Sequence, residues 1–318
     1  MDALAPFWQA LGWPLCRLLL GLAAGLLLAN VLEALRWTRH LARLAAPLAR
    51  VAHLRQVAGA AFALAFVSPA SANGLLADRY DAGELSRREL MLANLFNSLP
   101  AFFTHTPTIF FMTWPVLGWP ACIYVGLTLV AALLRTALTV LAARHLLPPP
   151  PPAPPLPTGA QPAFALRSAL HKAGRRFMAR LPRLVLFTVP VYVIMFLLQR
   201  QGIFSAAETW LAQHMDWLSF LKPQAMSIIV LHLAAELGAA LGAAGSLLQA
   251  GGLDAHDVVL ALMVGNILST PMRAIRHQLP AYAGFFRPAL AIRLIVANQG
   301  LRAASMVLVT LAYVLCYG

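Results

Sequence analysis

Charged residues are scarce in this sequence, and acidic residues are the scarcest of them. Asp, Glu, Lys and Arg make up 11% of the 318 residues, with 11 acidic and 24 basic side chains, whereas 60% are hydrophobic. The mean hydropathy is +0.72. Six apolar runs approach or exceed the roughly 20 residues that span a bilayer: about 14–35, 56–70, 101–146, 183–201, 223–248 and 286–316. The composition predicts an all-α polytopic membrane protein.

Cysteine is also rare, and the residue patterns typical of enzymes are missing. Cys16, Cys122 and Cys316 lie in apolar stretches without paired spacing, which argues against a disulfide or metal set. No nucleophile–base arrangement or phosphoryl-transfer motif is visible, so we expect neither an enzyme nor a bound cofactor, a coupling proton or cation apart. The N-terminus has no basic n-region, which predicts a retained first helix rather than a cleaved signal peptide.

The net charge of +13 reflects topology rather than nucleic-acid binding. Lys and Arg sit beside the apolar spans, so the expected partner is the lipid bilayer, and we expect no nucleic acid. Residues 36–55 and 162–183 read as basic amphipathic helices on the cytoplasmic surface. Residues 204–221 have similar apolar spacing but lack the arginines, which places them outside. Two halves of opposite topology follow, with both chain ends outside. The Ala, Leu and Arg bias is consistent with a bacterial inner membrane.

A proline run divides the two halves. Residues Pro148 to Pro157 are nearly all proline, which predicts a stiff polyproline II connector. The expected organisation is an N-terminal repeat over 1–147, a cytoplasmic linker over 148–160 and an inverted C-terminal repeat over 161–318. A homo-oligomer is an open alternative to a monomer.

Two small-residue stretches interrupt apolar runs at matching places in the halves. They are Ser68 to Gly74, with Ser71 and Asn73 inside it, and Leu241 to Ser246. Interrupted helices expose backbone groups that survive in a membrane only around a protein-lined cavity. Paired interruptions of this kind are typical of the substrate site of a transporter with inverted repeats and re-entrant helices.

A shift of 172 residues aligns polar residues of the two halves. Asn94 meets Asn266 and His105 meets His277, while Asn97 and Ser98 meet Ser269 and Thr270. Such a symmetric set of uncharged donors and acceptors can hold a small polar or anionic solute. The predicted substrate-binding residues are Ser68, Ser71, Asn73, Asn94, Asn97, Ser98, His105, Ser246, Asn266, Ser269, Thr270 and His277.

His232 and Glu236 lie four residues apart within an apolar run, so they share one face of the predicted helix. An ionisable residue at membrane depth is a functional hypothesis by default. We expect this pair to couple a proton or cation to transport. The alternatives are a self-satisfying polar pair and a shorter helix that is exposed to water. The sequence has no third ligand at helical spacing, which argues against a metal site.

The interrupted segment, the helix that ends in Asn94-Leu-Phe-Asn-Ser-Leu-Pro100 and its partner Asn266-Ile-Leu-Ser-Thr-Pro271 resemble the nucleoside-recognition or Gate domain family. Ferrous-iron permeases, concentrative nucleoside transporters and spore-maturation proteins contain this domain. The resemblance covers roughly residues 57–146 and 223–316 and implies a two-gate transport unit. This chain departs from the iron permeases because it has no GxxxxGK[ST] loop and no cysteine in either gate segment.

The sequence therefore predicts a secondary transporter that moves a small polar or anionic solute by alternating access, coupled to a proton or cation. One alternative is a metal-ion or other ion permease, with Glu236, His232, His105 and His277 as ligands. The other is a subunit that scaffolds a membrane complex without transporting a solute.

Overall fold

The fold comes from a computed structural model, which describes residues 8–34, 47–149, 166–202, 206, 209–210, 213 and 221–317. The described residues form helices and connecting turns, with no strand among them, so the predicted all-α class is confirmed for this part of the chain. The helices, with two π-helical turns named η, are η1 (Trp8–Gly12), α2 (Trp13–Ala34), α4 (Gln56–Ala65), α5 (Pro69–Asp81), α6 (Arg87–Phe96), α7 (Ser98–Leu117), α8 (Trp119–Leu146), α9 (Leu166–Arg200), α11 (Ala225–Gln249), α12 (Ala255–Leu268), α13 (Thr270–Arg273), η3 (Ala274–Gln278), α14 (Leu279–Phe285) and α15 (Pro288–Tyr317).

The chain forms two compact units, and each unit takes segments from both predicted halves. The first consists of Met1–Thr104, Thr136–Val193 and Leu279–Asn298, and the second of His105–Arg135, Ile194–Gln278 and Gln299–Gly318. The division into repeats over 1–147 and 161–318 concerns the sequence and stays a prediction. Most of the proline linker, and most of the predicted surface helices over 36–55 and 204–221, lie outside the described residues.

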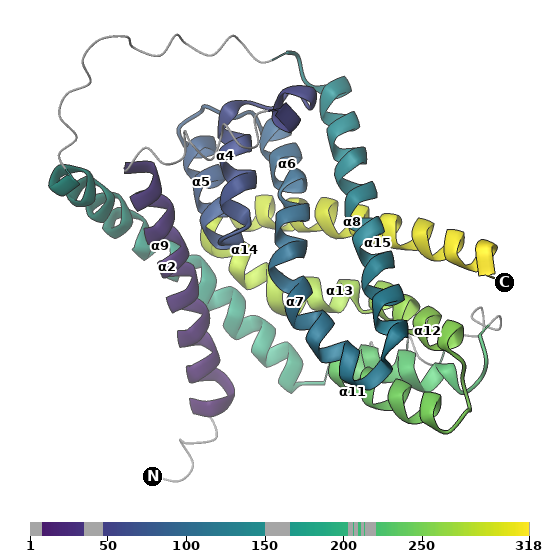
Figure 1. The fold of residues 1–318 in the computed structure, drawn as a ribbon. Helices are drawn as coiled ribbons and strands as arrows, with labels where there is room; N and C mark the ends of the chain where they lie inside the picture. Colours follow the sequence, from purple (N-terminus) through teal and green to yellow (C-terminus); the bar gives the residue numbers. More distant parts are fainter. Residues whose placement is uncertain are drawn as a thin grey trace. The chain divides into compact units, whose positions relative to one another are not determined.

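Helix α5 is at the centre of the first unit, where it contacts α2, α4, α6 and α14 (Figure 1). Leu75 and Leu76 of α5 are almost completely buried in a core that also takes side chains from α4 and α6. Phe62 of α4 stacks on Phe96 of α6 with 4.3 Å between ring centroids. These contacts fix α6, whose C-terminal end bears Asn94.

The second unit is built around the α11–α12 hairpin, whose helices lie side by side (Figure 1). Ile228 and Leu241 of α11 and Leu262 of α12 are fully or almost fully buried in its core. Helices α8 and α15 contribute to the same core through Tyr124 and Met306. An apolar helix with no polar face is buried by its neighbours, which is why α12 has almost no solvent-facing residue between Val258 and Asn266.

The turns of the α5–α6 and α11–α12 hairpins share a left-handed glycine and a capping box. Gly83 and Gly251 each follow a helix with φ of 73° and 69°, a left-handed conformation that other residues adopt at a cost. Three residues later, Ser86 and Asp254 open the next helix with a capping box. Because of this cap, α6 begins at Arg87.

The predicted interruption over Ser68 to Gly74 lies elsewhere. Helix α4 ends at Ala65, and α5 begins at Pro69 and continues through Asn73 and Gly74. Ser68 is the N-cap, and its hydroxyl accepts a hydrogen bond from the backbone N–H of Ser71 at 3.1 Å. Proline fits the first position of a helix because its missing N–H is not needed there. The interruption is therefore confined to residues 66–68.

The second predicted interruption, Leu241 to Ser246, is wrong, because α11 runs unbroken from Ala225 to Gln249. The small residues serve packing instead. A Cβ atom added to Gly245 would lie 2.5 Å from Cγ1 of Val116, so glycine allows α7 to approach α11 closely.

Gly245→Ala should therefore destabilise the protein by roughly 1–3 kcal/mol, since the added methyl group overpacks this contact. Gly242, one turn earlier in α11, has open space around the position of a Cβ atom. Gly242→Ala should instead leave stability unchanged or raise it by about 0.5–1 kcal/mol, because alanine favours a helix over glycine. Thermal unfolding in one detergent compares the two variants. Equal effects would show that the contact with Val116 does not constrain position 245.

Prolines do not interrupt the helices that contain them. Pro107 and Pro115 lie inside α7, and Pro182 and Pro190 lie inside α9, which joins a predicted surface helix and a predicted span. The helices break instead at Asn97, between α6 and α7, and at Ser269, between α12 and α13. The axis bends by 47° between Ala255–Leu268 and Thr270–Phe285.

Two helices of the described part of the chain, α8 and α15, are long and apolar enough to cross a membrane. The bent pair formed by α12 and the helices up to Phe285 would be a third if it is one span. Their length and composition are compatible with membrane association.

Candidate functional site

The strongest concentration of polar contacts in the second unit lies where α12 ends. Helix α12 ends at Leu268, so its last backbone carbonyls have no donor within the helix and need other partners. The hydroxyl groups of Ser269 and Thr270 both donate to the backbone oxygen of Asn266, at 3.2 and 2.9 Å. These three residues, all predicted for the site, are buried and lie together.

Two arginines converge on the same asparagine. Nη2 of Arg273 donates to the backbone oxygen of Asn266 at 2.9 Å and to its side-chain Oδ1 at 2.8 Å. Nη2 of Arg302, from α15, donates to the same Oδ1 at 2.8 Å. On the other side of this amide, Nδ2 of Asn266 donates to the hydroxyl of Tyr124 at 2.8 Å. A neutral amide oxygen therefore receives hydrogen bonds from two positively charged groups.

His232 of α11 lies next to this cluster. Its side chain is 1% exposed, and its Nδ1 has no hydrogen-bond partner among the described residues. Gly265 packs against the ring so closely that an added Cβ atom would lie 2.9 Å from Cβ and Nδ1 of His232. His232 is within electrostatic range of Arg273 and Arg302. The arrangement leaves a buried imidazole nitrogen beside two guanidinium groups.

The first unit has an uncharged counterpart at the end of α6. Nδ2 of Asn94 donates to Oδ1 of Asn73, on α5, at 3.0 Å. The Asn94 amide also lies 3.4 Å from the hydroxyl of Tyr282, on α14. Asn94 is 2% exposed, so these contacts satisfy an amide that is shielded from solvent.

Asn97, at the break between α6 and α7, is different. Its side chain is 6% exposed, and neither its amide nitrogen nor its oxygen has a partner among the described residues. A buried amide without partners costs about 1–3 kcal/mol. It is the predicted site residue in this unit with the greatest unmet hydrogen-bonding capacity.

The other predicted residues are placed less favourably. Ser68 caps α5, while Ser71 and Ser98 are buried in the first unit. Ser246 is exposed, and its hydroxyl donates to the backbone oxygen of Ala243. His105 and His277 both have exposed side chains, so they do not share the burial of Asn94 and Asn266. The side chain of Glu236 lies outside the described residues.

Sequence reasoning missed the two tyrosines that bind the asparagines. Tyr124 and Tyr282 lie within apolar segments, and a buried tyrosine hydroxyl usually finds a polar partner. That need for a partner was the available signal. It did not reveal the pairing, because each tyrosine is more than 140 residues away from its asparagine in the sequence.

Two proteins of Methanocaldococcus jannaschii, both described as uncharacterized, are similar to this chain. One is 26% identical over 242 residues, which cover 74% of this chain and 73% of the relative. The other is 24% identical over 239 residues, which cover 74% of each chain. No protein-family model and no solved structure matches the chain. The similar stretch is longer than either predicted half, so it is not confined to one of them.

Proposed function

We propose that the protein is a secondary membrane transporter that moves a small solute bearing an anionic group by alternating access. The observation that supports this most is the convergence of Arg273 and Arg302 on one neutral oxygen of Asn266, at a bend between helices. Charged residues inside a membrane protein typically mark substrate or ion pathways.

The chemistry of the Asn266 cluster favours an anion over a neutral solute. The Oδ1 atom of Asn266 accepts from both guanidinium groups but brings no negative charge. Among the described residues, this amide is the hydrogen-bond partner of the Arg302 side chain. A carboxylate or phosphate oxygen in its place would form charge-assisted hydrogen bonds, which are roughly twice as strong as neutral ones. The solute would therefore compete with Asn266 for the arginines.

His232 and Glu236 would supply the coupling in this proposal. Among the described residues, Nδ1 of His232 has no hydrogen-bond partner, and Glu236 follows His232 by one helical turn of α11. Arrival of an anion near Arg273 and Arg302 would offset the repulsion that their charges exert on a protonated His232. Uptake of the solute and uptake of a proton would then favour each other.

Helix lengths support two related repeats, although the number of positions that separates equivalent residues is not 172 throughout. Gly83 and Gly251 are 168 positions apart, and at this shift α11 covers the combined length of α4 and α5. The helix ends Phe96 and Leu268 are 172 positions apart, and α12 is the longer helix by the same four residues, 14 against 10. One extra helical turn in α12 reconciles the two shifts.

The asparagine contacts support the same relationship. Asn94 in the first half contacts Tyr282 of the second half, and Asn266 in the second half contacts Tyr124 of the first half. Reciprocal exchange of this kind is expected of two repeats related by a pseudo-twofold axis. At the shift of 168, Glu236 falls at Ser68, where the first repeat breaks between α4 and α5.

We propose that the protein lies in a bacterial inner membrane with both termini outside.

The proposal is tested by ligand-induced thermal stabilisation of the purified protein. Organic acids, phosphate compounds, nucleosides, amino acids and divalent metals are screened against wild type and Glu236→Gln at several pH values. We expect an anionic compound to raise the melting temperature of wild type, with a pH dependence that Glu236→Gln removes. Stabilisation by divalent metals alone would favour the ion permease. The absence of any stabilising compound would contradict the proposal and favour the scaffold subunit.

A further inference from the structure

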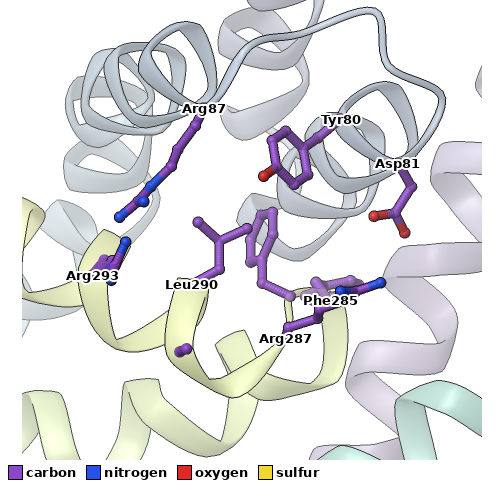
Figure 2. A pocket seen from close by; sticks show the side chains of 9 residues that line it. Tyr80, Asp81, Arg87, Phe285, Arg287, Leu290 and Arg293 are labelled. Carbon is purple, nitrogen blue, oxygen red and sulfur yellow. The ribbon is translucent and has the colours of Figure 1, made fainter.

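A cavity of about 460 Å³ lies in the first unit, and neither Asn94 nor Asn266 lines it. Its walls come from the end of α5, the start of α6 and the junction between α14 and α15 (Figure 2). The polar lining consists of Arg87, Arg287, Arg293, Tyr80 and Asp81, and the apolar lining of Phe285, Phe286, Ala289 and Leu290. A volume of this size falls within the range of small-ligand sites, about 300–1,000 Å³.

The cavity has an excess of positive charge, with three arginines against one carboxylate. Figure 2 shows Arg87 and Arg293 extending from two different helices toward the same side of the cavity, while Asp81 and Arg287 lie on the other side. The side chains of Arg87, Arg287 and Arg293 form no hydrogen bond or ion pair with any residue that the structure describes. Asp81 forms no ion pair with Arg87 or Arg293.

Two helix starts lie at the wall of the cavity. Arg87 is the first residue of α6, where Ser86 and Glu89 form a capping box, and Ala289 lies in the first turn of α15. Leu290 and Ala291 donate back to the carbonyl of Arg287, so the turn before α15 is fixed. Helix N-termini attract phosphate and carboxylate groups, and arginine binds both as a forked donor.

We propose that this cavity binds a phosphate-bearing group, held between Arg87 and Arg293, with the apolar remainder of the ligand against Phe285 and Leu290. The group could come from the headgroup of an anionic lipid or from a free phosphate compound, since both present the same oxygens. Basic pockets between helices on the cytoplasmic side of membrane proteins bind lipid headgroups in this way. The site shares no lining residue with the Asn266 cluster, so it goes beyond the proposed transport function.

The test uses the full-length protein, with thermal unfolding as the readout. One arm titrates inorganic phosphate in neutral detergent, and the other compares nanodiscs of phosphatidylglycerol with nanodiscs of phosphatidylcholine. We expect the double variant R87Q/R293Q to require about tenfold or more of the phosphate or phosphatidylglycerol to reach the same stabilisation, because two charge-assisted hydrogen bonds are lost. If the double variant loses stabilisation only in the nanodiscs, the ligand is a lipid headgroup. If it loses stabilisation by inorganic phosphate, the ligand is a free phosphate compound.

Three further variants separate the cavity from general charge effects. Arg88→Gln removes an exposed positive charge beside Arg87 that does not line the cavity, and it should behave as wild type. Ala289→Phe fills the cavity without changing its charge and should weaken binding like the double variant. Arg302→Gln, measured in parallel, registers any phosphate bound at Asn266 separately. Equal effects of Arg88→Gln and R87Q/R293Q, or no effect of the double variant in either arm, would overturn the proposal.

Discussion

Replacing Arg302 by glutamine should weaken the binding of the anionic solute by about 10- to 100-fold. The Arg302 guanidinium is one of two that meet at Oδ1 of Asn266, and hydrogen bonds to a charged group contribute about 1.5–3 kcal/mol. Glutamine keeps an N–H donor for Asn266 but loses the charge. Titration of the solute found in the stabilisation screen, read as thermal unfolding, measures the change.

The unliganded protein should be no less stable after this substitution. Removing Arg302 relieves its repulsion with Arg273, and replacing a buried ion by a neutral group is often neutral or stabilising. Arg144→Gln, at an exposed position near the end of α8, is the matched control and should bind the solute as wild type does. An Arg302→Gln protein that is stable and retains full affinity would exclude this arginine from the binding site.

Replacing Asn266 by aspartate should have opposite effects on stability and on solute binding. A carboxylate between Arg273 and Arg302 supplies the negative charge that the amide lacks, so the melting temperature should rise. The same carboxylate would occupy the position that we assign to the anionic group of the solute, so binding should be lost. Thermal unfolding with and without the solute reports both effects.

The matched control is Asn94→Asp in the first unit. Asn94 is 2% exposed, and its contacts are Asn73 and Tyr282 rather than arginines. A carboxylate there would be buried without a positive partner. Either the variant should be destabilised by several kcal/mol, or burial should raise the pKa of the new carboxyl group so that it stays neutral. If both aspartate variants lost stability alike, the Asn266 cluster would not have the positive potential on which our proposal depends.

The sequence was informative about element types and less so about where the chain breaks. Hydrophobic runs located α2, α11 and α15 closely, whereas the run over 101–146 is divided into α7 and α8. The small residues over Leu241 to Ser246 indicated an interruption, but glycine and alanine also let helices pack closely. Gly245 does so against Val116, a partner that is far away in the sequence. Local composition could not distinguish these two roles.

The sequence predicted only part of the candidate site. Asn94 and Asn266 were visible because they recur at a fixed shift, and the structure makes each the centre of a polar cluster. His105 and His277 recur at that shift too, yet both are exposed. Recurrence at a fixed shift therefore does not by itself indicate burial. Predicting the contacts of Tyr124 and Tyr282 requires knowledge of which helices pack together, and a single sequence does not contain it.

The measurement that tests the transport function most directly is solute-driven flux in proteoliposomes. Wild type, Arg302→Gln and Glu236→Gln are reconstituted at equal density, and the solute identified by thermal stabilisation is applied with and without a pH gradient. We expect saturable uptake by wild type that the pH gradient drives, loss of uptake with Arg302→Gln, and uptake independent of the gradient with Glu236→Gln. Tight binding of the solute without any flux in wild type would contradict the account, and would indicate a binding subunit of a membrane complex instead.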